Sequence, residues 1–414
     1  MQAGLKGNMS NQETRSPAMT GANVIRSKRN CAVCGGSEKT LLFEQTFSTV
    51  CLLEGYAVAV CPHCGFAFAD DIPEQEAFDQ YYRELSKYEY QHRGGRESAS
   101  DETRQRGIAA NLLSLIPDKS VRILEIGSST GRLLSLLKES GCQNVWGLDP
   151  SPACAASARE LYDVTILTQS VSDLAKSPDK FDLLIMVGVL EHIRDLEGAL
   201  GTMHQILSPN ARIYMDVPDA TQFADWPDAP FQQFSTEHIN FFSGTSLANL
   251  MRTRGYEAIF SEKVLHQYTD VTVMPSVRAL FEYRGSAVSA SVADDQSEPR
   301  LREYIEQSRA VDQRIRQLID RTVGNREPIL VWGVGTHTQR LLATGGLDRV
   351  NISAFVDSNP KYHGQRLRDI PIVSPDSLSG RREPILVCSR VFQKEIEQQI
   401  HQQLHLNNEV LSLY

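Results

Sequence analysis

A chain of 414 residues is too long to fold around a single hydrophobic core, so we expect two or three domains. Its net charge of -9 gives no basic field for a phosphate backbone, which argues against nucleic acid as a partner. The longest apolar run, residues 183–190, is far too short to cross a bilayer, so no membrane partner is expected.

Residues 1–29 lack the apolar core of a signal peptide and contain much Gly, Asn, Ser and Thr. This composition predicts a disordered tail on a cytoplasmic protein. In the cytoplasm cysteines stay reduced, so they are available to a metal rather than paired in disulfides.

Two C-x-x-C pairs follow the tail: Cys31 with Cys34 and Cys61 with Cys64, separated by 26 residues and each followed by glycine. A hairpin can bring the four sulfurs together as a tetrahedron. Four thiolates fill the coordination shell of zinc, so the pattern predicts a structural Zn²⁺ site in a domain over residues 30–72. Unrelated cysteine pairs or a redox motif are the alternatives.

A tyrosine-rich segment opens the next predicted domain, residues 73–285, and places Tyr81, Tyr82 and Tyr88 among charged residues. A ring with a polar tip suits the wall of a pocket for a polar or cationic ligand. A helix packed on the edge of the domain is the alternative interpretation.

Residues 121–149 show the pattern strand, glycine turn, helix, strand. The apolar run 121–126 predicts a buried parallel strand that ends in E-I-G-S-S-T-G. The second strand, 145–148, ends at Asp149, whose carboxylate can accept hydrogen bonds from ribose hydroxyls. Glu125 stands where a dinucleotide site has its first glycine, and its charge would repel a pyrophosphate but suits an ammonium or sulfonium group.

The motif E-x-G-x-x-x-G resembles the first motif of class I S-adenosylmethionine-dependent methyltransferases, which implies a Rossmann-like α/β core. A glycine turn in another α/β protein is the alternative. Further strands are predicted at 164–167, 181–187 and 212–217, and the V-L-E-H sequence after the second resembles the matching segment of the same enzymes. Ligands bind beyond the carboxyl ends of parallel strands, so these turns should converge on one crevice. The expected cofactor contacts are Glu125, Gly127, Ser128, Gly131, Asp149, Pro150, Asp173 and Leu190.

The loop after the last of these strands carries Glu237 and His238. A histidine beside a carboxylate, on a loop at the rim of the crevice, is a candidate general base because its pKa lies near neutrality. The alternative is that His238 only caps or packs the next helix.

Residues 286–326 predict a helical linker, because apolar residues recur at helical spacing over 301–319. Residues 327–414 predict a second, Rossmann-like α/β unit whose glycine turn follows a first strand at 329–332. Thr338 stands where a dinucleotide motif would have its third glycine, so NAD is not expected there. We expect this unit to close over a substrate or simply to pack.

From Cys31 onward, the order of zinc pairs, tyrosines, methyltransferase core, E-H-x-x-F-F-S loop and second Rossmann-like unit resembles the three-domain C-methyltransferases of nucleotide-linked keto-deoxysugars. The resemblance implies that His238 and Glu237, together with tyrosines, remove a proton next to the sugar ketone. One position departs from the family pattern, because Ser235 stands where a tyrosine is common.

The expected function is methylation of carbon in a nucleotide-linked keto-sugar, by removal of an α-proton and attack on the sulfonium methyl. S-adenosylmethionine and structural zinc are the expected cofactors, and a sugar nucleotide is the expected small-molecule partner. One alternative is O- or N-methylation, with His238 deprotonating a hydroxyl or amine. Another is a zinc-stabilised scaffold that binds S-adenosylmethionine without turnover. The residues do not specify an oligomeric state.

Overall fold

The computed structural model describes residues 26–48, 52–85, 89, 94–176, 179–226, 228–269, 272–285, 291–325 and 327–414. The predictions for residues 1–25 and for Tyr88 lie outside these ranges. The described chain forms three main sheets, of seven, four and six strands. None of the helices in these ranges combines the length and the apolar character needed to cross a membrane.

The seven-stranded sheet has the order β12-β13-β10-β9-β6-β7-β8. Its strands from β8 to β10 run parallel, and β13 is antiparallel to both β10 and β12. The strands are β6 (Ile123–Ile126), β7 (Val145–Leu148), β8 (Ile166–Leu167), β9 (Phe181–Val187), β10 (Leu207–Pro218), β12 (Tyr256–Gln267) and β13 (Val273–Tyr283). The predicted parallel core is confirmed, although its third strand is shorter than expected.

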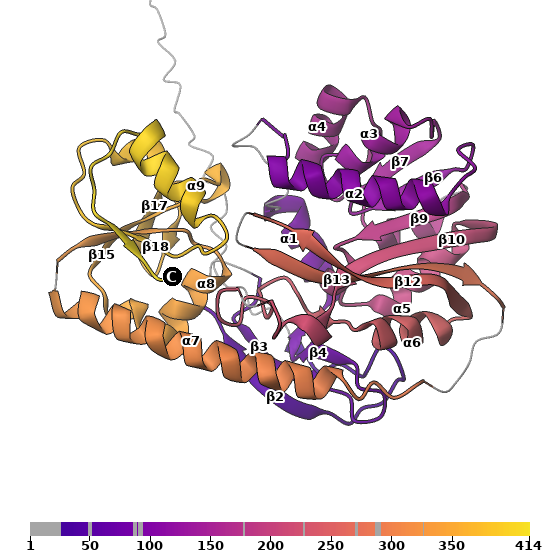
Figure 1. Ribbon diagram of the computed structural model, residues 1–414, viewed down its shortest axis with the longest axis horizontal. Helices are drawn as coiled ribbons and strands as arrows, with labels where there is room; N and C mark the ends of the chain where they lie inside the picture. The colour runs from indigo at the N-terminus through magenta and orange to yellow at the C-terminus, as the bar shows by residue number, and fades with distance from the viewer. Residues whose placement is uncertain are drawn as a thin grey trace, which may run out of the picture.

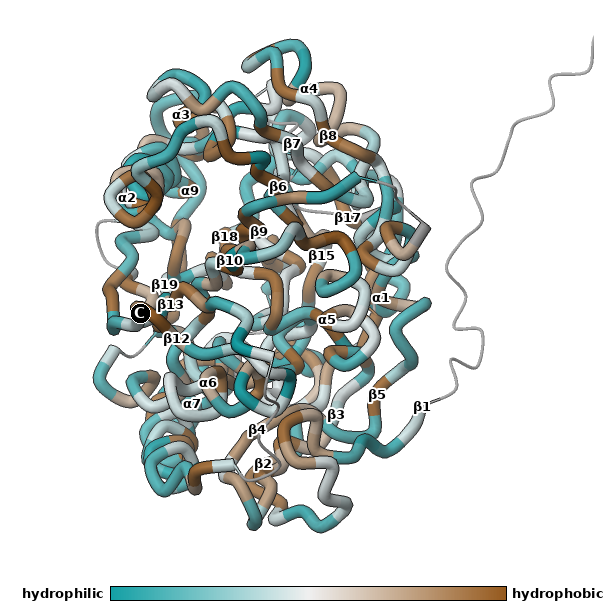
Figure 2. The backbone as a smooth tube through the Cα atoms, turned by 90° about the vertical axis from the view of Figure 1, so that its right-hand side faces the viewer, coloured by the Kyte–Doolittle hydropathy of each residue, from teal (hydrophilic) through white to brown (hydrophobic). Residues whose placement is uncertain are grey.

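Helices cover both faces of this sheet (Figure 1). They are α2 (Ala99–Leu115), α3 (Arg132–Glu139) and α4 (Pro152–Tyr162) on one face, and α5 (Leu196–Gln205) and α6 (Gly244–Arg252) on the other. Strand side chains alternate between the two faces: Leu183 and Ile185 pack under the first group of helices, while Leu184 and Met186 pack on the second. Figure 2 shows hydrophobic residues along β6, β9 and β10 in the interior, as expected for strands buried on both faces.

The four-stranded sheet has the order β11-β4-β3-β2 and contains the segment between the cysteine pairs. Its strands are β2 (Thr40–Thr46), β3 (Gly55–Val60), β4 (Ala67–Asp70) and β11 (Asn240–Phe241). A two-stranded pair, β1 (Arg26–Ser27) with β5 (Ile72–Pro73), precedes helix α1 (Gln75–Leu85). Strand β11 comes from the segment after His238, so this sheet is completed by a distant part of the chain.

Helix α7 (Ser297–Asn325) runs along both halves of the molecule (Figure 1). Its first turns pack on the four-stranded sheet through Leu301, Tyr304 and Ile305. Its later turns pack on the C-terminal sheet through Ile315 and Ile319. This helix lies within the helical linker predicted over 286–326 and includes the apolar spacing over 301–319.

The C-terminal sheet has the order β16-β17-β15-β14-β18-β19. Its strands are β14 (Ile329–Trp332), β15 (Ile352–Val356), β16 (Arg366–Leu367), β17 (Ile370–Val373), β18 (Ile385–Val387) and β19 (Val410–Ser412), with helices α8 (Thr336–Arg340) and α9 (Gln393–Gln398). Strands β14, β15, β17, β18 and β19 pair in parallel. The predicted second Rossmann-like unit is present.

Candidate active site

A cavity of about 1380 Å³ opens at the carboxyl ends of the central parallel strands and extends to the C-terminal sheet. The loops after β6 and β7 line it with Gly127 and Asp149, and the loop before β11 lines it with His238. The C-terminal unit contributes Gly333 and Asp357 from the other side. The crevice expected at the strand ends is therefore closed over by the second α/β unit.

The turn after β6 has the backbone conformation that the glycine motif predicts. Gly127 has φ of 71°, and a Cβ placed on it would lie 2.5 Å from Cγ2 of Val189. Gly131 has φ of 81° at the start of α3. A side chain at Gly127 would thus be strained and would collide with the loop after β9, so glycine is required for this close approach.

Asp149 is held in place by the backbone of two neighbouring turns. Its Oδ2 accepts the N–H of Ser129 at 2.9 Å and its Oδ1 accepts the N–H of Ser151 at 2.9 Å. Burial raises the pKa of Asp149 to about 6, despite these hydrogen bonds. Each oxygen keeps a second lone pair, so the carboxylate can still accept hydrogen bonds from two hydroxyls of a ligand.

Glu125 lies at the end of β6, is only 4% exposed and lines the same cavity. Its Oε2 is buried and has no hydrogen-bond partner among the described residues. Burial, and then the nearby Asp149, raise the pKa of Glu125 well above its usual value. An orphaned carboxyl oxygen of this kind fits a ligand that carries an ammonium group, since a cation would supply both the missing hydrogen bond and the counter-charge.

Among the other expected cofactor contacts, Ser128 and Pro150 line the cavity, whereas Gly131, Asp173 and Leu190 do not. Asp173 is exposed in the turn η3 (Val171–Lys176), and its Oδ2 caps that turn by accepting the N–H of Ser170 at 2.9 Å. Leu190 is fully buried in the core, so the expected contact shifts to the adjacent Val189, which lines the cavity.

The loop before β11 is shaped by Ser235. Its Oγ accepts the backbone N–H of Glu237 at 3.2 Å and that of His238 at 3.0 Å. A tyrosine hydroxyl lies too far from its own backbone to make these local hydrogen bonds. In this chain the serine side chain therefore fixes the loop through two hydrogen bonds that a tyrosine could not make. Both Glu237 and His238 line the cavity.

The tyrosines of α1 reach this loop and its neighbour. Tyr81 donates its hydroxyl hydrogen to Oε1 of Glu237 at 3.0 Å, and the hydroxyl of Tyr82 lies 2.9 Å from Nδ1 of His192. Nδ1 of His192 also lies 3.0 Å from the carbonyl oxygen of Glu237. A carbonyl oxygen can only accept, so in the neutral imidazole this contact places the proton on Nδ1 and makes Nε2 the acceptor.

Several residues of this site were not predicted from the sequence. His192 and Glu191 lie in η4 (Leu190–His192). A ring nitrogen of His192, a carboxyl oxygen of Glu191 and a ring nitrogen of His238 all lie within 4.8 Å of one another. Asp216 and His266 also line the cavity, with Nε2 of His266 2.9 Å from Oδ2 of Asp216. The V-L-E-H motif was the available signal for the first two. The second two lie inside strands β10 and β12, where no local motif marks them.

The four predicted cysteine ligands come together in the N-terminal part of the chain. Sγ of Cys31 lies 3.4 Å from that of Cys64, and Sγ of Cys34 lies 3.5 Å from that of Cys61. All four sulfurs lie within 4.8 Å of one another. A tetrahedron with metal–sulfur bonds of about 2.3 Å has edges of about 3.8 Å, which this cluster approaches. A hydrogen bond from Cys64 lowers the pKa of Cys31 to about 5, whereas burial raises that of Cys61 to about 11. A cation would therefore be needed to hold all four sulfurs as thiolates.

The glycine turn of the C-terminal unit repeats part of the first site. Gly333 has φ of 101°, and Oδ2 of Asp357 accepts the N–H of Val334 at 3.0 Å. Thr338, which replaces the third glycine of a dinucleotide motif, donates its hydroxyl hydrogen to the carbonyl oxygen of Gly333 at 2.7 Å. The threonine side chain therefore stabilises the turn by a hydrogen bond within it.

Comparison with protein families identifies the central part of the chain. The family described as methyltransferase domain matches residues 100–260. Residues 100–260 are thus a methyltransferase domain. A second family, described as C2185-like, N-terminal, matches residues 325–410.

Individual relatives match part of the chain at low identity. The chain is 31% identical over 102 residues to a ubiquinone biosynthesis O-methyltransferase from Azorhizobium caulinodans, over 23% of this chain and 40% of the relative. Among solved structures, it resembles magnesium protoporphyrin IX methyltransferase from Synechocystis with 14% identity and a TM-score of 0.37, over 50% of this chain and 96% of the other. It also resembles a Burkholderia thailandensis 1,6-didemethyltoxoflavin-N1-methyltransferase with 18% identity and a TM-score of 0.40, over 57% and 99% of the two chains.

Proposed function

We propose that the protein is an S-adenosylmethionine-dependent methyltransferase that methylates carbon in a nucleotide-linked keto-sugar. The observation that supports this best is that one cavity is lined by both Glu125 with Asp149 and Glu237 with His238. The first pair fits an amino-acid ammonium group and a ribose. The second brings acid–base groups to the same space, as removal of a proton requires.

S-adenosylmethionine would supply the electrophilic methyl group. Glu125 would pair with its ammonium group, Asp149 would accept hydrogen bonds from its ribose, and the loop at Gly127 would allow close approach of the backbone. Because Asp173 is exposed, its carboxylate reaches the adenine amino group only if the turn that it caps rearranges.

His238 is the proposed base for the α-proton of the substrate. Its ring centroid lies 5.0 Å from that of His192, so two imidazoles lie close together in the cavity. Glu237, held by Tyr81, would stabilise the imidazolium that forms, and Tyr82 holds His192. We assign the base role to His238 because its side chain is less buried than that of His192.

The substrate assignment rests on the order of domains and on the second Rossmann-like unit. Gly333, Asp357 and Asn359 line the far end of the cavity, where a nucleotide carried by the substrate would lie. O- or N-methylation remains the second candidate, because the curated relative from Azorhizobium is named as an O-methyltransferase. In that reaction His238 would deprotonate a hydroxyl or amine.

The four-cysteine cluster is proposed to bind structural zinc. It packs in one core with Phe66 and Phe242, so the metal would hold the N-terminal sheet against the methyltransferase domain. With four sulfur ligands the ion has no open position for a substrate.

Incubation with methyl-labelled S-adenosylmethionine and a panel of sugar nucleotides tests the proposal. Keto-sugar nucleotides, reduced sugar nucleotides and amino-sugar nucleotides would be compared. We expect label only in the keto-sugar product, with the new methyl on carbon by NMR. A methyl on oxygen or nitrogen would select the second candidate function.

A further inference from the structure

Glu191 is a buried carboxyl group that the proposed chemistry leaves without a role. It lies in η4, is 3% exposed and lines the cavity. Its Oε2 is buried and has no hydrogen-bond partner within the described part of the chain. An ionised carboxylate in this position would be costly to bury, because its desolvation outweighs the hydrogen bond from its own backbone N–H.

The charged groups around Glu191 are already matched to other partners. Asp216 on β10 pairs with His266 on β12, at 2.9 and 3.1 Å from Nε2 to its two oxygens. Arg104 on α2 pairs with Asp101 at 2.8 Å and lies over the ring of the cavity-lining Tyr268, at 4.4 Å from its centroid. His192 on the same turn has Nε2 3.9 Å from Oε1 of Glu191, and His238 completes the surroundings.

These surroundings favour the neutral acid. Burial, and then the negative charge of Asp216, raise the pKa of Glu191 to about 8. A carboxyl group kept neutral in an apolar site can donate a hydrogen bond to an oxygen that gains charge in a reaction. Its atoms and the ring nitrogens of His192 and His238 all lie within 4.8 Å of one another, so a donor and an acceptor face the same small space.

We propose that Glu191 acts as a neutral carboxylic acid that donates its hydrogen to the carbonyl oxygen of the substrate while the enolate forms. This rests on the proposed methylation of carbon. As His238 takes the α-proton, the C–H electron pair becomes the C=C bond and the C=O pair moves onto the oxygen that Glu191 holds. When the carbonyl re-forms, the α-carbon bonds to the methyl group and sulfur keeps the pair of the broken C–S bond. The proton stays on Glu191 throughout.

The first test measures the protonation state and needs no substrate. The free energy of unfolding of the whole chain is measured by urea denaturation from pH 5 to 9, for the wild type and for Glu191→Gln. The folded pKa is raised above the unfolded value, so the stability due to Glu191 is present at low pH and is lost as the pH rises to about 8. The unfolding constants of the two proteins should diverge by up to tenfold per pH unit over this window.

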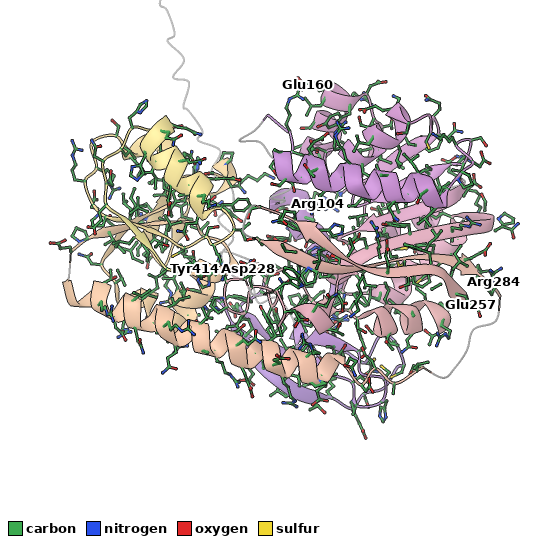
Figure 3. The ribbon with its side chains drawn as sticks, viewed as in Figure 1. Arg104, Glu160, Asp228, Glu257, Arg284 and Tyr414 are labelled. Carbon is green, nitrogen blue, oxygen red and sulfur yellow. The ribbon has the colours of Figure 1, made fainter. Side chains whose placement is uncertain are left out.

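Glu191→Leu provides a second reference that does not titrate, in case Glu191→Gln folds poorly. Glu160→Gln, on the outer surface of α4 in Figure 3, is the matched control and should follow the wild type. A constant ratio between the wild type and both Glu191 variants would overturn the proposal, because it would mean that Glu191 is not protonated by folding.

The second test measures catalysis with the keto-sugar nucleotide that the labelling experiment selects. Glu191→Leu should lose 10² to 10³-fold in kcat, as expected for removal of one donor to an oxyanion. Glu191→Gln keeps an N–H donor, so it should retain more activity and lack the fall in rate that the wild type shows above about pH 8. Equal kcat in Glu191→Leu and the wild type would overturn the inference alone, whereas a product methylated on oxygen or nitrogen would overturn the proposed function with it.

Discussion

The two carboxyl groups at the cofactor end of the cavity differ because their hydrogen bonds differ. Asp149 accepts two backbone N–H groups, and burial raises its pKa only to about 6. Glu125 has one oxygen without a described partner, and its pKa lies well above the usual value. At neutral pH Asp149 is therefore ionised in the free protein, while a cation that reaches Glu125 would lower the pKa of that carboxyl group.

Asp149→Ala should weaken binding of S-adenosylmethionine by roughly ten- to a hundredfold, since hydrogen bonds to a charged acceptor contribute about 1.5 to 3 kcal/mol. Isothermal titration calorimetry measures this directly. Asp320→Ala, on the exposed face of α7, is the control. Unchanged affinity for this cofactor, together with tight binding of NAD, would contradict the assignment.

Affinity for S-adenosylmethionine should also depend on pH through Asp149. The pKa is raised, so the carboxyl is protonated below about pH 6 and becomes a poorer acceptor. The dissociation constant should rise as the pH falls from 7 to 5. The same titration with Asp149→Asn should show a flatter profile, and parallel profiles would place the titrating group elsewhere.

His238→Ala should leave cofactor binding intact and lower both methyl transfer and exchange of the substrate α-proton with deuterated water by about 10² to 10⁴-fold. Exchange is followed by NMR with the keto-sugar nucleotide found active in the labelling experiment. His401→Ala, on the surface of the C-terminal unit, is the control. If His192→Ala loses exchange while His238→Ala keeps it, His192 is the base.

Among the elements, the regular ones follow closely from the sequence. Apolar runs and helical spacing predict β6, β7, β9, β10, β14 and α7, because the pattern of buried residues along each segment is local. The pairing of β11 with β4 joins segments far apart in the chain, and no local pattern encodes it. Prediction of the site is limited in the same way. The loop motifs locate Glu125, Asp149 and His238, but His266 belongs to strand β12 and reaches the site only because of how that strand is placed in the sheet. The position of Asp173 in the motif predicts a cofactor contact, whereas in the structure its carboxylate accepts a hydrogen bond from the backbone of its own turn.

Replacement of Cys61 and Cys64 together by serine should remove one zinc ion per chain and lower the stability of the N-terminal sheet. Metal binding contributes directly to the folding of a small zinc site. Mass spectrometry for elements gives the zinc content, and thermal unfolding gives the stability. Cys142→Ser, a buried cysteine outside the cluster, should keep the zinc. Unchanged zinc in the double variant would contradict the assignment.

At the scale of the whole molecule, the loop that carries Glu237 and His238 is held from several sides. The hydroxyl of Tyr56 on β3 donates to the carbonyl oxygen of Ser235 at 2.9 Å. The hydroxyl of Tyr304 on α7 accepts the N–H of Gln233 at 3.0 Å. From the C-terminal unit, Arg390 donates to the carbonyl oxygen of Asp228 at 3.1 Å, and Figure 3 shows Asp228 next to Tyr414 at this junction. The site thus depends on all three sheets.

Tyr304→Phe should destabilise the protein by about 1 to 3 kcal/mol, because the buried N–H of Gln233 loses its acceptor. We expect slower α-proton exchange with unchanged cofactor affinity, since the loop after β6 is not touched. Urea denaturation measures the stability, NMR the exchange and calorimetry the cofactor affinity. Tyr283→Phe, at an exposed ring on β13, is the matched control, and equal stability of the two variants would contradict this role for α7.

The pairing of β11 with β4 also bears on how the chain is made. Phe68 pairs with Asn240, so about 170 residues must be added after β4 before its partner strand exists. At 5 to 20 residues per second, roughly ten to thirty seconds pass between synthesis of β4 and synthesis of β11. Throughout this time the cysteines have been made and the edge of β4 is unpaired. During that interval the nascent N-terminal segment needs protection from other strands, and early capture of zinc would provide it before the catalytic half has been translated.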